Sequence, residues 1–360
     1  MKEWRNAVNQ NKIRRAKNRT AAHLFPAVLF FYAVFLIFPA ATSAGDRLAS
    51  SITKAAEDFV QITESQTEPD VGHPVSVTKK TFSVAGLDRT YRLLLVSDLH
   101  IIVPGDPQVD PECADVAGSR LNEMFRTPSG ESSFQLWQTL PSQLDGMKAD
   151  MILFAGDMVD FATKASTDSL RAGFDSLRTP WMYVRGDHDY AAWYSKSYET
   201  QKDAIVLQAN TAPRKKVMRQ RIGKLTIIGW DNNTAQMTKK GLRDLEKYLQ
   251  EAKDEKSPVL LLCHVPLRGT VTDKLEQESL QKNGRALLWG DSGCYYRPDD
   301  TTKQALDLIL DAGSPVALEA SGHLHFPYSG PLTETSTIIT ADPAFQNQID
   351  ELVLVPGNSQ

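Results

Sequence analysis

Cysteine is scarce in this sequence, which has only three among 360 residues: Cys113, Cys263 and Cys294. An odd number excludes a chain whose cysteines all pair with one another, so at least one thiol is unpaired within the molecule. Cys263 ends an apolar run and is expected to be a reduced core residue. Cys113 and Cys294 fall in two loops expected on one face, where we expect separate thiols, with a disulfide as the alternative.

Internal repeats and low-complexity tracts are also lacking. Hydrophobic residues make up 41% of the chain and aromatic residues 8%, which is an ordinary composition for a globular protein. The length allows one large α/β domain or two smaller ones.

Residues 1–22 form a basic arm. This arm carries seven basic residues and one acidic residue, a net charge of +6, whereas the whole chain carries −4 and the remainder therefore −10. A basic arm can indicate nucleic-acid binding, but the acidic remainder argues against tight binding of long nucleic acids.

The basic arm is followed by an uncharged apolar segment, residues 24–40. This order predicts that the arm stays in the cytoplasm and that the rest is exported. Residues 23–44 reach the lower length limit for a transmembrane anchor. They also resemble a signal peptide, because small residues follow Pro39. We therefore expect either a membrane-anchored protein with an extracytoplasmic catalytic domain or a secreted one.

Residues 45–75 are interpreted as a connector to a catalytic domain spanning residues 76–357. Apolar residues from Leu48 to Ile62 recur at helical spacing and predict a short amphipathic helix. Residues 67–74 then form a turn-rich hinge.

Five short apolar runs dominate the domain, and each is expected to form a strand buried on both faces. Aspartate or histidine follows every run, and these residues are Asp98, His100, Asp157, Asp187, His188, His264, His323 and His325. Ligands in open α/β sheets bind beyond the carboxyl ends of the strands. We therefore expect these side chains together at one edge of a sheet. Alternating β and α units predict the α/β fold class.

The other expected elements are assigned from periodicity and turn signals. They are strands at 81–84, 217–222, 225–230, 336–340 and 351–355, and helices at 134–147 (interrupted by Pro141), 167–178, 242–252 and 302–313. Long loops at 101–130 and 267–300 are expected over the active face. The second contains Trp289, Tyr295, Tyr296 and Arg297, which either stack on a base or sugar of a substrate or pack on the surface.

The strand-end residues have the chemistry of a metal centre. Five of the seven histidines occur there, together with three aspartates. Imidazole and carboxylate donors without paired cysteines suit Mn, Fe or Zn. Seven ligands are too many for one ion with an open position, and a two-metal site fits the number.

The order Asp-x-His, Gly-Asp, Gly-Asp-His-Asp, His and Gly-His-x-His resembles the motif set of the calcineurin-like metallophosphoesterases, over about residues 90–345. The resemblance implies a two-sheet β-sandwich flanked by helices, in four layers α/β/β/α. It also implies that Asp98, His100 and His325 hold one metal ion and that Asp187, His264 and His323 hold a second. Asp157 would bridge both ions, and His188 would be the general acid or stabilise the phosphoryl oxygens.

This chain departs from the family at Asp187, where the family usually has asparagine. A third carboxylate should tighten metal binding and reduce Lewis acidity somewhat, or favour a trivalent ion at one position. Asp189 replaces the more common glutamate and is expected to support the ligands rather than bind metal.

The implied reaction is hydrolysis of a phosphate ester or pyrophosphate by a hydroxide that two metal ions activate. The expected substrate is a phosphorylated small molecule or a lipid. The alternative is a catalytically degenerate metal-binding or sensor domain at the membrane, in which Asp187 marks the degeneration. The intact His188 and the full ligand set argue against this alternative.

Overall fold

The computed structural model describes residues 60–62, 74–106, 114–190, 201–212, 215–233, 236–290 and 293–357. The basic arm, the apolar segment, the hinge up to residue 73 and Cys113 lie outside these residues. Within them, no helix is both long enough and apolar enough to cross a bilayer.

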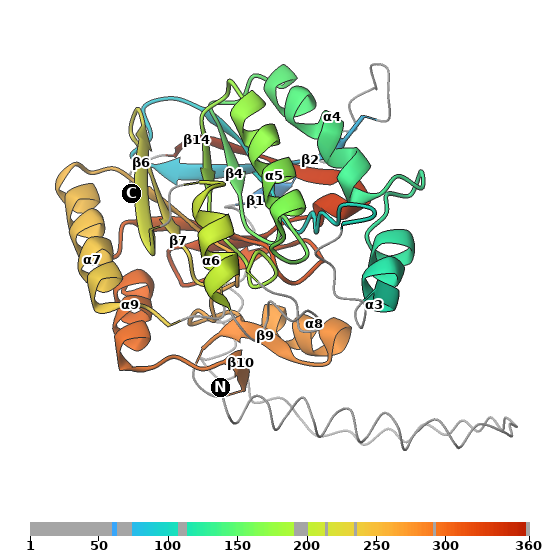
Figure 1. Cartoon of the computed structure of the whole chain (residues 1–360). Coiled ribbons are helices and arrows are strands. Elements are labelled where there is room, and N and C mark those ends of the chain that lie inside the picture. The colour runs from blue at the N-terminus through green and yellow to red at the C-terminus, as the bar shows by residue number, and fades with distance from the viewer. Residues whose placement is uncertain are drawn as a thin grey trace, which may run out of the picture. The chain divides into compact units, whose positions relative to one another are not determined.

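In the described part of the chain, two mixed sheets contain six strands each. Figure 1 shows helices around the strands. In spatial order, the first sheet contains β1 (Val60–Ile62), β2 (Ser76–Ala85), β14 (Gln348–Gly357), β3 (Tyr91–Val96), β4 (Met151–Phe154) and β5 (Trp181–Tyr183). The second contains β12 (Tyr328–Pro331), β13 (Thr337–Thr340), β11 (Val316–Ser321), β8 (Val259–Cys263), β7 (Leu225–Trp230) and β6 (Val217–Ile222). A separate parallel pair is formed by β9 (Ala286–Trp289) and β10 (Cys294–Tyr296).

The five motif strands are divided between the two sheets, so the expectation of a single sheet edge was wrong. β3, β4 and β5 are parallel neighbours in the first sheet, and β8 and β11 are parallel neighbours in the second. An apolar run indicates that a strand is buried, but it carries no information about which sheet the strand joins.

Helices cover the outer faces of both sheets. Apolar side chains of α4 (Ser133–Gly146) and α5 (Lys164–Ser176) share a core with the first sheet. Those of α7 (Lys239–Asp254) and α9 (Asp300–Leu310) share a core with the second. The remaining helical segments are α3 (Ala114–Ser119), the π-helix η3 (Arg120–Met124), α6 (Gln201–Ala209), α8 (Asp273–Asn283) and the 3₁₀ turn η5 (Ala344–Gln346).

A third core lies between the two sheets, and the central strands contribute to it with every second residue. In β3, Leu93 and Leu95 enter this core, whereas Leu94 and Val96 pack beneath α4 and α5. β8 alternates in the same way between the inter-sheet core and the core under α7 and α9. The expected burial on both faces is confirmed, and the fold is an α/β arrangement of two mixed sheets flanked by helices.

Most of the predicted elements are confirmed. The β6–β7 hairpin has the predicted bounds, and the four predicted helices correspond to α4, α5, α7 and α9. Contrary to expectation, Pro141 does not interrupt α4, which continues to Gly146. Cys263 is a buried thiol, as predicted.

Three predictions were wrong in part. Ile62, expected in a helix, belongs to β1 and pairs with Lys80 of β2. The loop at 267–300 contains α8, β9 and β10, and the loop at 101–130 contains α3 and η3. In α8 only Leu275 is a buried apolar residue. A single apolar position shows no helical periodicity, so the sequence does not indicate this helix.

Candidate metal centre

The strand-end residues adopt an unusual backbone conformation. The φ angles of Asp98, His100, Asp157, His323 and His325 are 56°, 52°, 51°, 70° and 57°. A left-handed conformation costs a non-glycine residue about 1–2 kcal/mol. Hydrogen bonds between neighbouring strand ends help to hold these turns, among them Asp98 N to Gly156 O at 3.0 Å and His100 N to Asp157 O at 2.9 Å. Strain of this kind is concentrated at functional sites.

Two glycines allow the strand ends to approach closely. A Cβ at Gly156 would lie 2.6 Å from His264 Nδ1, and a Cβ at Gly322 would lie 1.8 Å from Ser97 Oγ. Such distances are far below van der Waals contact. The absence of a side chain at these glycines therefore leaves space for neighbouring side chains of the site. It also allows strand ends of the two sheets to approach each other.

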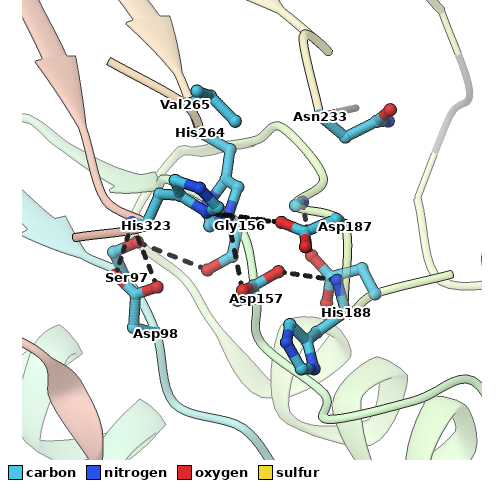
Figure 2. Close-up of polar contacts among 12 residues, drawn as sticks. Ser97, Asp98, Gly156, Asp157, Asp187, His188, Asn233, His264, Val265 and His323 are labelled. Carbon is cyan, nitrogen blue, oxygen red and sulfur yellow. Dashed lines mark hydrogen bonds and ion pairs between the residues drawn. The ribbon is translucent and has the colours of Figure 1, made fainter. Parts of the chain in front are cut away.

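The structure gathers the seven expected ligands into two overlapping sets. The first donor group contains Asp98, His100, Asp157 and His325, and the second contains Asp157, Asp187, His264 and His323. Within each group the donor atoms all lie within 4.8 Å of one another. Figure 2 shows the side chains of the second group pointing toward one another. The division is the one that the family resemblance implies.

Asp157 belongs to both groups and lies between them. Its Oδ2 is 3.3 Å from His264 Nε2 and 3.7 Å from His100 Nε2, so one carboxylate oxygen faces an imidazole of each group. Its Oδ1 accepts a hydrogen bond of 2.9 Å from the backbone N–H of His188. This bond fixes the orientation of the carboxylate.

The second donor group fits a metal ion on its hydrogen bonding alone. His264 Nδ1 lies 2.7 Å from Ala155 O, and a carbonyl only accepts, so Nδ1 carries a proton. His264 Nε2 then faces Asp157 Oδ2 and Asp187 Oδ1, each at 3.3 Å. Asp187 Oδ1 is buried without a hydrogen-bond partner among the described residues. The lone pairs of His264 Nε2 and of the two carboxylate oxygens face one another. Their mutual repulsion is relieved by a cation placed among them.

In the absence of metal, a proton can meet this need. Burial lowers the pKa of His264, but the negative charge of Asp157 and the closeness of the Asp157 and Asp187 carboxylates raise it well above its ordinary value. A metal ion would displace that proton, since binding requires a neutral imidazole.

The first donor group is arranged in a similar way. His100 Nε2 faces His325 Nε2 at 3.1 Å, and His325 Nε2 lies 3.4 Å from Asp98 Oδ1. Burial lowers the pKa of His100 to about 4, although a hydrogen bond to Asp160 opposes this shift. His100 is therefore neutral near pH 7, as a metal ligand must be.

Asp160 was not identified from the sequence, although it follows Asp157 by three residues. Its buried carboxylate lies 3.0 Å from His100 Nδ1. Arg120 of η3 pairs with both of its oxygens, at 2.7 and 2.5 Å. Phe125 stacks on the His100 ring at 4.2 Å. Two residues of the segment after β3, Arg120 and Phe125, thus pack around the first donor group.

His188 lies beside both groups without belonging to either. Its Nδ1 is 3.0 Å from the backbone O of Asp160, which leaves Nε2 as the atom that can reach a substrate. Burial lowers the pKa of His188, but the charge of Asp157 and the hydrogen bond and charge of Asp160 raise it to about 10. The imidazole therefore carries a proton at neutral pH.

Two further residues hold the loops that carry the ligands. Asp189 accepts hydrogen bonds from Val159 N at 3.0 Å and Gly186 N at 2.8 Å, joining the loops after β4 and β5. Asn232 Oδ1 accepts from the backbone N–H groups of His264 and Val265, both at 3.0 Å. Asn232 was not identified from the sequence, because an asparagine directly after a strand is also common in turns.

The aromatic residues at 289–296 have different roles. Trp289 is buried, and its indole N–H donates to Asn232 O at 2.9 Å, so it packs rather than stacks on a substrate. Tyr296 Oη lies 3.0 Å from His323 Nε2. Tyr295 is 38% exposed.

Comparisons with known proteins show the family of this chain. The sequence model of the calcineurin-like phosphoesterases matches residues 91–327. Similar solved structures include a dimetal phosphatase from Danio rerio (12% identity, 72% of this chain and 89% of that chain covered, TM-score 0.45). Another is a purple acid phosphatase from yellow lupin seeds (12% identity, 79% and 49% covered, TM-score 0.43). A search of curated proteins found no match. Since the family model covers well over half of its length, the chain belongs to the calcineurin-like phosphoesterase family.

Proposed function

We propose that this protein is a metal-dependent hydrolase that cleaves a phosphate ester or a pyrophosphate. The observation that carries the proposal is the position of Asp157 in both donor groups, with His188 bonded to it through the backbone. Shared carboxylates of this kind hold pairs of metal ions in phosphatases.

In this proposal, Asp98, His100 and His325 would hold one ion, Asp187, His264 and His323 would hold the other, and Asp157 would serve both. Nitrogen and oxygen donors suit divalent Mn, Fe or Zn. When bound, the two ions supply a water nucleophile of lowered pKa and neutralise charge on the phosphoryl oxygens.

In this proposal, His188 and Asp160 control the proton that the leaving oxygen receives. Because Asp160 fixes His188 Nδ1, the Nε2 proton is available to the leaving oxygen of the substrate. The carboxylate of Asp160, which is not one of the proposed ligands, lies 3.0 Å from His188 Nδ1 and favours the protonated imidazole. Proton donation by a positioned side chain contributes about 10²–10⁴-fold to rate.

We further propose that the catalytic domain acts outside the cytoplasm, on a phosphorylated small molecule or lipid. The support is the basic arm at 1–22 followed by the apolar segment at 24–40. Cell fractionation of the full-length protein, with mass analysis of its N-terminus, separates an anchored form from a cleaved one. Recovery of the intact chain in the cytoplasm would contradict export.

The reaction is tested with purified protein and a panel of aryl phosphate monoesters, aryl diesters and pyrophosphates, each with Mn, Fe or Zn. We expect metal-dependent turnover of at least one class, and its loss in Asp157→Ala. Two bound ions without turnover of any substrate would instead support a metal-binding or sensor domain.

A further inference from the structure

Tyr296 contacts a residue of the second donor group from the side opposite the proposed metal ion. Its Oη lies 3.0 Å from His323 Nε2. The other ring nitrogen, His323 Nδ1, faces His264 Nε2 at 3.2 Å and Asp187 Oδ1 at 3.4 Å. The two nitrogens of this imidazole thus have separate partners.

Metal binding through Nδ1 requires one particular tautomer of His323. A neutral imidazole carries one proton, and the nitrogen that binds a metal must present its lone pair. If Nδ1 faces the ion, the proton is on Nε2 and needs an acceptor, which the phenol oxygen of Tyr296 provides. With the proton on Nε2 and the phenol oxygen accepting it, Nδ1 presents its lone pair to the metal position.

We propose that Tyr296 is a positioning residue for the second metal ion, which it serves by holding the ring and the tautomer of His323. The inference rests on the proposed metal centre. The backbone of His323 is already held, because its N–H donates to both oxygens of Asp98 at 3.1 and 3.0 Å. The hydroxyl of Tyr296 restrains the ring.

Contacts with the neighbouring strand β9 hold Tyr296 in its position in β10. It pairs with Trp289 of β9 in the parallel register, and the two rings lie 5.6 Å apart. Trp289 donates to the backbone O of Asn232, whose side chain holds the backbone of His264. The segment after β8 therefore supports both histidines of the second donor group.

The neighbouring tyrosine provides a matched control. Tyr295 is 38% exposed, and its ring lies 4.9 Å from the guanidinium carbon of Arg285. Replacing either tyrosine with phenylalanine removes one hydroxyl and leaves the ring packing. Only the change at position 296 removes an acceptor from a proposed ligand.

The experiment is a calorimetric titration of metal-free, full-length protein with Mn or Zn. We expect two binding steps in the wild type. Tyr296→Phe should weaken one of them about 10–100-fold, the usual effect of removing a hydrogen-bond partner of a ligand. That step should be the one lost in Asp187→Ala. The other step, and both steps in Tyr295→Phe, should stay unchanged.

Thermal unfolding of the metal-free variants checks that the fold is intact. Wild-type affinity at both steps in a folded Tyr296→Phe variant would overturn the inference. So would equal weakening in Tyr295→Phe, since the effect would then be a general one. A wild-type protein that binds no ions would contradict the proposed function itself, before any variant is compared.

Discussion

The two donor groups have the same composition but differ in what holds their histidines. Each contains two imidazoles and two carboxylates, with Asp157 in both. In the first, His100 is held by the carboxylate of Asp160, which is paired with Arg120. In the second, His264 is held by a backbone carbonyl and His323 by a phenol. A charged partner makes a ligand more basic, whereas a neutral one mainly orients it.

The groups also differ in how they depend on the two sheets. Three members of the first group, Asp98, His100 and Asp157, follow strands of the first sheet, and only His325 follows a strand of the second. The second group takes two residues from each sheet. Its geometry therefore depends more strongly on the packing between the sheets.

The largest effect is expected from Asp157→Ala, which removes the residue common to both groups. Tight binding of both ions should be lost, and activity should disappear. Elemental analysis of the purified variant tests this. Retention of two ions would show that Asp157 does not link the groups.

A large effect on turnover alone is expected from His188→Gln. The side chain belongs to neither donor group, so the metal content should remain close to that of the wild type. Turnover should fall about 10²–10⁴-fold on a substrate with a poor leaving group. Unchanged kcat on such a substrate would remove His188 from the proton transfer.

Asp160→Asn should affect the first group selectively. The amide cannot replace the negative charge beside His100, so binding of the first ion should weaken about 10–100-fold. The second binding step should change little, which is the reverse of the result expected for Tyr296→Phe. Equal weakening of both steps in a metal titration would mean that the two groups are not separately supported.

The smallest effect is expected from Asp187→Asn, which exchanges a carboxylate for an amide of similar shape. The side chain is 26% exposed, so solvent screens part of the lost attraction. Binding of the second ion should weaken by about tenfold, or about 1.4 kcal/mol, and the enzyme should stay active. Equal or tighter binding in a titration would refute the electrostatic reasoning.

The positions of the proposed ligands were predictable because each occurs where an apolar run ends. A buried strand such as β3 or β8 can be recognised by its continuous apolar sequence. The polar residue after it then lies at the edge of a sheet. The partition into two sheets was not predictable from periodicity, because β4 and β8 are equally apolar and equally buried.

The supporting residues were harder to predict because their roles depend on contacts distant in sequence. Asp160 acts on His100, sixty residues earlier, and Tyr296 acts on His323, twenty-seven residues later. Tyr296 was considered only as a stacking residue, since no local pattern indicates that a tyrosine will face an imidazole. The expectation that Cys113 and Cys294 are separate thiols, with a disulfide as the alternative, stays a prediction, because Cys113 lies outside the described residues.

The most direct test of the central claim is anomalous diffraction from crystals of the Mn- or Zn-loaded protein. The proposed centre predicts two peaks about 3.5–4 Å apart, one in each donor group, with the carboxylate of Asp157 contacting both. A single peak, or two peaks of which neither contacts Asp157, would contradict a shared two-metal centre.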